Sequence, residues 1–199
     1  MPSPTIYYIR HGETSWNAAG RFQGGQDIPL NDTGRAQASA AGGILGDLLK
    51  REGRDPAALP YVASPLGRTR MTMELLRAAL GLPAQGYDLD DRLREIRYGR
   101  WEGFTLAEME AADPALFARR SADKWGTAPP GGETYVTLTE RMRDWHGSVS
   151  SDIVTVAHGG TARALMVAMG LKRPEEAADL YIEQGVVYVF SDGKLAKYA

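Results

Sequence analysis

The sequence of 199 residues contains no cysteine and only three histidines, His11, His146 and His158. The lack of cysteine excludes disulfides, thiolate metal sites, iron–sulfur clusters and a cysteine nucleophile. A multi-histidine metal site is poorly supplied as well, although carboxylates could contribute ligands. We expect neither a metal nor another cofactor. A sequence without cysteine is also compatible with the reducing cytoplasm, which is the expected location.

Long apolar runs and a strong excess of charge are also missing. No apolar stretch approaches the roughly 18 residues of a membrane-spanning helix, and residues 1–4 show no signal-peptide pattern. The 23 Lys and Arg residues nearly balance the 25 Asp and Glu residues, which leaves a net charge of −2 at pH 7. This balance provides no overall attraction to nucleic acid or to a membrane, so neither is an expected partner.

The remaining composition is that of a globular protein, with 43% hydrophobic and 24% charged residues. The length predicts a single domain over residues 1–199. Short strands alternate with helices, which predicts a three-layer α/β/α sandwich with a mostly parallel sheet. A Gly- and Pro-rich stretch at about 100–132 interrupts this alternation and predicts a cap-like insertion. The predicted strands are 6–9, 61–63, 153–156 and 186–190, and the predicted helices are about 32–49, 65–80, 133–145 and 161–169.

Two details of these elements are more specific. Ser64 and Pro65 are expected as the N-cap and first residue of the helix at 65–80, which carries Met71, Leu75 and Ala79 at helical spacing. The strand at 186–190 is the last one predicted, and an internal position in the sheet is its default. At an edge, it would offer a pairing surface for a homodimer.

Two of the three histidines directly follow predicted strands. His11 and His158 each stand between a strand and a glycine, and ligands of parallel sheets collect at the carboxyl ends of strands. Arg10 adjoins His11, and Arg68 lies in the first turn of the helix after the second strand. If these strands are neighbours, two arginines and two histidines converge into a positively charged pocket.

The ligand that such a pocket favours is a phosphate. The forked donors of arginine match phosphate oxygens, and backbone N–H groups at Gly12, Gly159 and Gly160 can approach an anion closely. The helix that begins near Thr161 would point its N-terminus at the same place. A neutral imidazole there can act as a general base or as a nucleophile, and attack on phosphorus would form a phosphohistidine.

The alkoxide that leaves from a phosphate ester also needs a proton. Glu95 is the candidate donor, because it lies in an uncapped stretch where a loop can aim it inward. Spacing alone does not separate it from Asp90, Asp91 or Glu102.

Ordered sequence blocks resemble the histidine phosphatase superfamily, which includes the cofactor-dependent phosphoglycerate mutases and many small phosphatases. The resemblance runs from residue 6 to about 170. Its main blocks are Arg10-His11-Gly12-Glu13-Thr14 with Trp16-Asn17, Arg21-Phe22-Gln23-Gly24, Ser64-Pro65-Leu66-Gly67-Arg68-Thr69, Leu93-Arg94-Glu95, Gly131-Gly132-Glu133-Thr134 and His158-Gly159-Gly160 with Arg163.

The resemblance implies a role for each matching residue. His11 would be the phosphorylated nucleophile, with Arg10, Arg68 and His158 completing the phosphate pocket. Glu95 would be the proton donor and acceptor, and no metal would take part in the chemical step. Further substrate and phosphate contacts are implied for Asn17, Gln23, Gly24 and the backbone at Gly159.

The resemblance is closer to the small phosphatases than to the mutases. Mutases are longer, usually have Thr where this chain has Gln23, and carry a Glu-Arg-His-Tyr-Gly run where it has Glu95-Ile96-Arg97-Tyr98-Gly99. A phosphomonoester hydrolase acting on a small phosphorylated metabolite is therefore expected. A mutase is the alternative, and a non-catalytic phosphate- or protein-binding module is a third possibility.

The substrate itself stays open in the sequence, because it depends on the cap. Sugar phosphates, phosphoserine, α-ribazole phosphate and nucleotide fragments all fit the motifs. Arg119 and Arg120 resemble a basic pair that mutases use on their substrate, but here we expect them on the cap surface.

Overall fold

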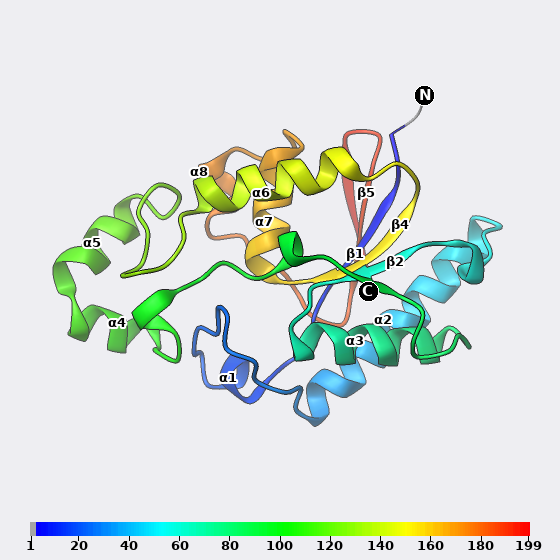
Figure 1. Ribbon diagram of the computed structural model, residues 1–199, viewed down its shortest axis with the longest axis horizontal. Coiled ribbons are helices and arrows are strands. Elements are labelled where there is room, and N and C mark those ends of the chain that lie inside the picture. The colour runs from blue at the N-terminus through cyan, green and yellow to red at the C-terminus, as the bar shows by residue number, and fades with distance from the viewer. Residues whose placement is uncertain (1–2) are drawn as a thin grey trace.

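A six-stranded mixed sheet forms the centre of the computed structural model, which describes residues 3–199 (Figure 1). Met1 and Pro2, which begin the stretch tested for a signal peptide, lie outside the described residues. The strands follow the order β3-β2-β4-β1-β5-β6 across the sheet. Their bounds are β1 Ile6–Arg10, β2 Tyr61–Ala63, β3 Asp88–Leu89, β4 Ile153–Ala157, β5 Val187–Ser191 and β6 Lys194–Tyr198.

The register of the central strands determines where the site forms. β1 pairs in parallel with β4, so that Arg10 lies opposite Ala157. β2 continues the parallel part on the other side of β4, whereas β5 and β6 pair antiparallel. The residues that follow β1 and β4, His11 and His158, therefore leave the sheet side by side at one edge.

Helices cover both faces of the sheet (Figure 1). α2 and α3 lie on one face, and α6 and α7 lie on the other, so the predicted three-layer sandwich is confirmed. No helix within residues 3–199 is both long and apolar enough to cross a lipid bilayer. The helix bounds are α1 Ser15–Ala18, α2 Asp32–Arg51, α3 Gly67–Ala79, α4 Leu106–Ala112, α5 Pro114–Ala122, α6 Tyr135–Ser148, α7 Gly159–Ala168 and α8 Pro174–Ala177.

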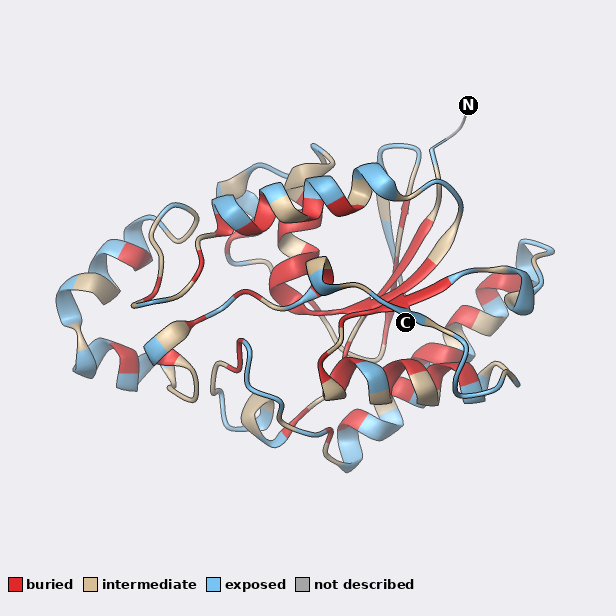
Figure 2. Ribbon diagram, viewed as in Figure 1, coloured by how far each residue is buried: buried red, intermediate tan, exposed pale blue. Residues whose placement is uncertain are grey.

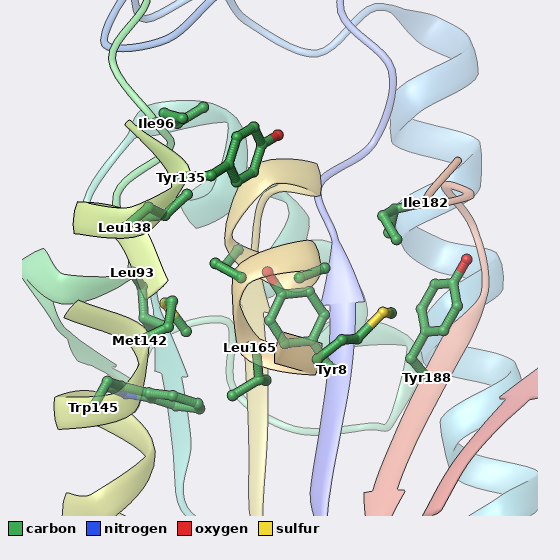
Figure 3. Close-up of a cluster of buried hydrophobic side chains, with 14 of the residues drawn as sticks. Tyr8, Leu93, Ile96, Tyr135, Leu138, Met142, Trp145, Leu165, Ile182 and Tyr188 are labelled. Carbon is green, nitrogen blue, oxygen red and sulfur yellow. The ribbon is translucent and has the colours of Figure 1, made fainter. Parts of the chain in front are cut away.

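Alternation along β1 builds a separate core on each face. Tyr7 and Ile9 pack with the helices α2 and α3, whereas Ile6 and Tyr8 pack with α6 and α7. All four side chains are fully buried, and each contributes about 1.5–3 kcal/mol by leaving water. Figure 2 shows the buried central strands, and Figure 3 shows Tyr8 beside Leu165 in the second core. Packing in both cores thus holds β1 in place, the strand that leads into His11.

The predicted start of α3 is wrong. The helix begins at Gly67 after Leu66, and the N–H of Gly67 donates to the carboxylate of Asp27 at 2.8 Å. A side chain from a distant loop therefore replaces the local cap expected at Ser64, which is engaged elsewhere.

The predicted apolar face of α3 is also displaced. Its buried apolar side chains are Met73 and Leu76, whereas Met71 and Leu75 are only half-buried and Ala79 is exposed.

The strand at 186–190 is not the last strand. β5 turns through Asp192 and Gly193, both with positive φ (49° and 68°), into β6. An Asp-Gly pair of this kind is a strong hairpin signal that the sequence interpretation passed over. β5 is thus internal, between β1 and β6, and does not provide the edge considered for a homodimer.

Helices α4 and α5 lie within the stretch predicted as a cap and project from one end of the sandwich (Figure 1). Arg119 is exposed there, as expected. Arg120 is not on the surface, because only 8% of it is exposed. Its guanidinium donates to the carbonyl of Thr127 and lies 5.9 Å from the centre of the Tyr98 ring.

Candidate active site

A cavity of about 280 Å³ lies where β1 and β4 end. It collects residues from the whole length of the chain, including eight of the nine residues singled out from the sequence. Its lining comprises Arg10, His11, Asn17, Gly20, Arg21, Phe22, Gln23, Gly24, Arg68, Glu95, Tyr98, Gly159, Arg163 and Tyr181. The ninth residue, His158, lies against His11, with 5.2 Å between the ring centres.

His11 is held in one tautomer. Its Nδ1 lies 2.8 Å from the carbonyl oxygen of Gly12. Because a carbonyl only accepts, Nδ1 carries the hydrogen and Nε2 keeps a free lone pair. Gly12 is required here, since a Cβ at this position would lie 2.1 Å from the backbone oxygen of Gly34. The backbone of Gly12 thus leaves Nε2 as the free lone pair of His11.

The surroundings keep the imidazole of His11 neutral. Burial is the largest effect and, with the guanidiniums of Arg68 and Arg10, lowers its pKa well below 6.5. Burial, Arg68 and His11 lower the pKa of His158 in the same way. A neutral imidazole has the lone pair that attack on phosphorus needs.

His158 is positioned by contacts that the sequence did not predict. Its Nε2 lies 2.8 Å from the hydroxyl of Ser64, the residue that was expected to cap α3 and does not. Its backbone N–H donates to the hydroxyls of Tyr8 and Thr161 at 3.1 and 3.0 Å. The ring is completely buried, so these contacts fix its orientation behind His11.

Arg10 and Arg68 are anchored by backbone carbonyls rather than by carboxylates. Arg10 Nη1 donates to Ile182 at 2.6 Å, and Arg68 donates to Gln26 and Gly24 at 2.5 and 2.9 Å. Across residues 3–199, Nε of both side chains is buried without a partner. Burial lowers the pKa of both groups, to about 10 for Arg68. Such cations are costly to bury alone and favour an anionic ligand.

Glu95 reaches the cavity from the loop after β3. Its Oε2 accepts from the N–H of Gly160 at 3.2 Å, and its Oε1 accepts from Ile96 at 3.0 Å. A Cβ at position 160 would lie 2.3 Å from Oε1, so only glycine allows this approach. The carboxylate therefore sits at the N-terminus of α7, in the cavity that holds His11.

The other acidic candidates are engaged elsewhere. Asp90 and Asp91 pair with Arg92 and Arg94, both at 2.7 Å. Glu102 accepts from the backbone N–H groups of Gly25 and Tyr98. None of the three lines the cavity that holds His11.

Three further predicted residues reach the cavity in different ways. Asn17 is the third residue of α1 and completes the capping box with the N-cap residue Thr14, and its Oδ1 accepts from the N–H of Thr14 and from Gln184. Gln23 is buried, and its Oε1 has no partner in the described part of the chain. Gly24 orients Arg68 through its carbonyl. The contact of Asn17 with a ligand stays a prediction, whereas its contact with the start of α1 is present in the structure.

Sequence reasoning missed the loop after α8. Gln184 donates to the carbonyl of His11 at 3.0 Å, and the exposed ring of Tyr181 lies 5.9 Å from the guanidinium of Arg10. Arg163 lines the cavity and donates to the carbonyl of Leu180 at 2.8 Å. Only Arg163 carried a signal, as part of a matching block. Within residues 3–199, no three histidine or acidic side chains are grouped as a metal site would require.

The neutral histidines should be visible in a pH titration. Below pH 6.5 the unfolded chain binds protons that the buried rings of His11 and His158 do not, so lowering the pH destabilises the fold. The free energy of unfolding should fall by up to about 1.4 kcal/mol per pH unit for each ring. Urea unfolding between pH 7.5 and 5.5 measures this slope, and histidine ¹⁵N NMR should show both rings neutral at pH 6. Titration of His11 near pH 6.5 would contradict the prediction.

Together these features define a class of site. A buried neutral histidine lies in a cavity beside two guanidiniums that form no ion pair with a carboxylate among residues 3–199. Enzymes that transfer phosphoryl groups through a covalent intermediate combine a nucleophile with cationic groups that hold the phosphate oxygens. The sequence profile of the histidine phosphatase superfamily (branch 1) matches residues 6–192, and the chain belongs to this superfamily.

Relatives agree with this assignment. A glucosyl-3-phosphoglycerate phosphatase from Mycolicibacterium vanbaalenii is 38% identical over 82% of this chain and 73% of its own length. A 2,3-bisphosphoglycerate-dependent phosphoglycerate mutase from Gloeobacter violaceus is 29% identical, covering 93% of this chain and 84% of its own. The solved structure of a mycobacterial glucosyl-3-phosphoglycerate phosphatase superposes on this chain with a TM-score of 0.76 and 31% sequence identity. The matched region covers 94% of this chain and 89% of the mycobacterial chain. The predicted family, fold class and phosphatase class are confirmed.

Proposed function

We propose that this chain hydrolyses phosphomonoesters through a phosphohistidine at Nε2 of His11. The observation that carries the proposal is the state of His11, which is neutral, fixed as the Nδ1–H tautomer and placed beside Arg10 and Arg68. The guanidiniums and His158 hold the phosphate oxygens. Nε2 attacks phosphorus while the ester P–O bond breaks, and a protonated Glu95 gives its proton to the departing oxygen.

The second half of the reaction reverses these roles. Water enters after the alcohol leaves, and Glu95, now a carboxylate, accepts a proton from it. The water oxygen attacks phosphorus, the P–N bond to His11 breaks, and inorganic phosphate departs. His11 returns to its neutral state, so the cycle needs no other reactant. Asn17, Gln23 and the backbone at Gly159 add contacts to the phosphate.

A second cavity suggests what the alcohol half of the substrate looks like. It has a volume of about 260 Å³, lies beside α4 and α5, and shares Phe22 and Tyr98 with the cavity that holds His11. Its walls are mainly apolar and aromatic, but Nη2 of the buried Arg120 has no partner among residues 3–199. Lys124 lies there too, paired with the exposed Asp179. These cations favour a small substrate whose alcohol half carries a carboxylate. A phosphoglycerate derivative is a substrate of this kind.

Phosphate release from a small panel in excess EDTA tests the proposal. The panel contains p-nitrophenyl phosphate, 3-phosphoglycerate and glycerol 3-phosphate, and the last two differ in the carboxylate. Release should resist EDTA, and a charge-assisted hydrogen bond from Arg120 should favour 3-phosphoglycerate at least about 10-fold in kcat/KM. Equal kcat/KM values would remove the role of Arg120 but not the hydrolysis. Conversion to 2-phosphoglycerate without release of phosphate would identify a mutase.

A further inference from the structure

A guanidinium outside the cavity holds the chain segment that carries Glu95. Arg141 of α6 donates from Nη1 to the carbonyl oxygens of Arg92 and Arg94, at 2.6 and 2.7 Å. Its Nη2 donates to both carboxylate oxygens of Glu133, at 3.2 and 3.0 Å. We call Arg141, Glu133 and these two carbonyls the Arg141 clamp.

The clamp acts on the backbone on both sides of Glu95. The carbonyl of Arg94 belongs to the peptide group that joins it directly to Glu95, and Arg141 fixes that group. On the other side, the N–H of Glu133 donates to the carbonyl of Arg97 at 2.9 Å. The segment 92–97 is therefore tied at one end to Arg141 of α6 and at the other to Glu133, which directly precedes the N-cap residue of α6.

The ion pair within the clamp is itself well sheltered. Only 8% of the Glu133 side chain and 22% of the Arg141 side chain are exposed. A paired, charge-assisted contact of this kind is stronger and more directional than a surface ion pair. Glu133 thus fixes the plane of the guanidinium, and the guanidinium fixes the carbonyls.

We infer that Arg141 and Glu133 are positioning residues for the general acid Glu95. The inference rests on the proposed function, since it assigns them a part in proton transfer to the leaving group. Among residues 3–199, the Glu95 carboxylate makes two hydrogen bonds, which it accepts from the backbone N–H groups of Ile96 and Gly160. Proton transfer needs a separation of about 2.6–3.2 Å, and a 1 Å displacement can cost about 100-fold in rate. The clamp supplies this precision from outside the cavity.

The test compares two aryl phosphates that differ in how much their leaving groups need a proton. Arg141→Met should lower kcat/KM for phenyl phosphate at least about 10-fold more than for p-nitrophenyl phosphate. Arg143→Met is the matched control, since Arg143 is exposed on the same helix. It should leave both values unchanged.

A double-variant cycle shows whether Arg141 acts through Glu95. In a Glu95→Gln background, Arg141→Met should add no further loss that depends on the leaving group. Equal losses with both substrates in the single variant, or a further selective loss in the double variant, would overturn the inference.

A second variant covers the case in which Arg141→Met does not fold. Glu133→Gln keeps the shape of the side chain and is read with the same pair of substrates and the same expectation. If Glu95→Gln itself shows no dependence on the leaving group, the assignment of Glu95 fails instead.

Discussion

Replacing His11 by alanine should lower kcat/KM for every phosphomonoester substrate by about 10⁴-fold or more, because it removes the atom that bonds to phosphorus. Arg10 and Arg68 keep their carbonyl anchors in this variant, so the phosphate should still bind. The expected result is therefore a loss of turnover with direct binding of inorganic phosphate retained, and isothermal titration calorimetry of the variant and the parent measures that binding. Initial rates with p-nitrophenyl phosphate measure the loss.

Two controls make the His11 result specific. His146→Ala changes a half-exposed histidine of α6 that is absent from the cavity lining, and it should leave the rate unchanged. Unchanged far-UV circular dichroism of His11→Ala would show that the fold persists. The parent enzyme, quenched with alkali during turnover, should carry a phosphoryl group on His11. Substantial activity of His11→Ala would remove the nucleophile assignment.

The sequence predicts the centre of the site well because that centre depends on strand ends. Arg10 ends β1 and His11 follows it, and His158 follows β4, so parallel pairing alone places the three residues at one edge of the sheet. Arg68 is one residue into its helix, on the same side of the sheet. The local sequence pattern predicts the strands and where they end, and the parallel topology then brings the carboxyl ends of neighbouring strands together.

The surroundings of the site escape prediction because they are contacts between distant segments. Ser64 and His158 are 94 positions apart, and Gln184 and His11 are 173 apart. Each of these residues is common in loops, and nothing in its neighbours marks the partner. The cap of α3 by Asp27 has the same origin: a local Ser-Pro signal was overridden by a carboxylate from a loop 40 positions away.

The burial of Arg120, in the region proposed to bind the substrate, also could not be predicted from the sequence. A charged residue on a short cap helix is expected to face water. In the structure, Tyr98 and the carbonyl of Thr127 enclose the guanidinium of Arg120 on α5. Burial of that cation depends on how α5 sits against the loop that holds Glu95, which no periodicity records. The same packing couples the region expected to choose the substrate with the region expected to protonate it.

Glu95→Gln should lower kcat/KM by a factor that depends on the leaving group of the substrate. The amide fills the same space but cannot donate the proton that an alkoxide needs, and general acid catalysis is worth about 10²–10⁴-fold. We expect kcat/KM to fall by that factor for phenyl phosphate or an alkyl phosphate. For p-nitrophenyl phosphate, whose leaving group is stable as an anion, the fall in kcat/KM should be less than about 10-fold.

The ratio kcat/KM is the right quantity because it reports only the steps up to departure of the alcohol. The parameter kcat also includes hydrolysis of the phosphohistidine, in which Glu95 serves as a base, so it should fall with both substrates. Asp91→Asn is the control, since Asp91 is an exposed acid of the same segment that pairs with Arg94. It should change neither ratio. Equal losses of kcat/KM on both substrates in Glu95→Gln would mean that another group protonates the leaving oxygen, and the phosphohistidine route through His11 would stand without Glu95 as its acid.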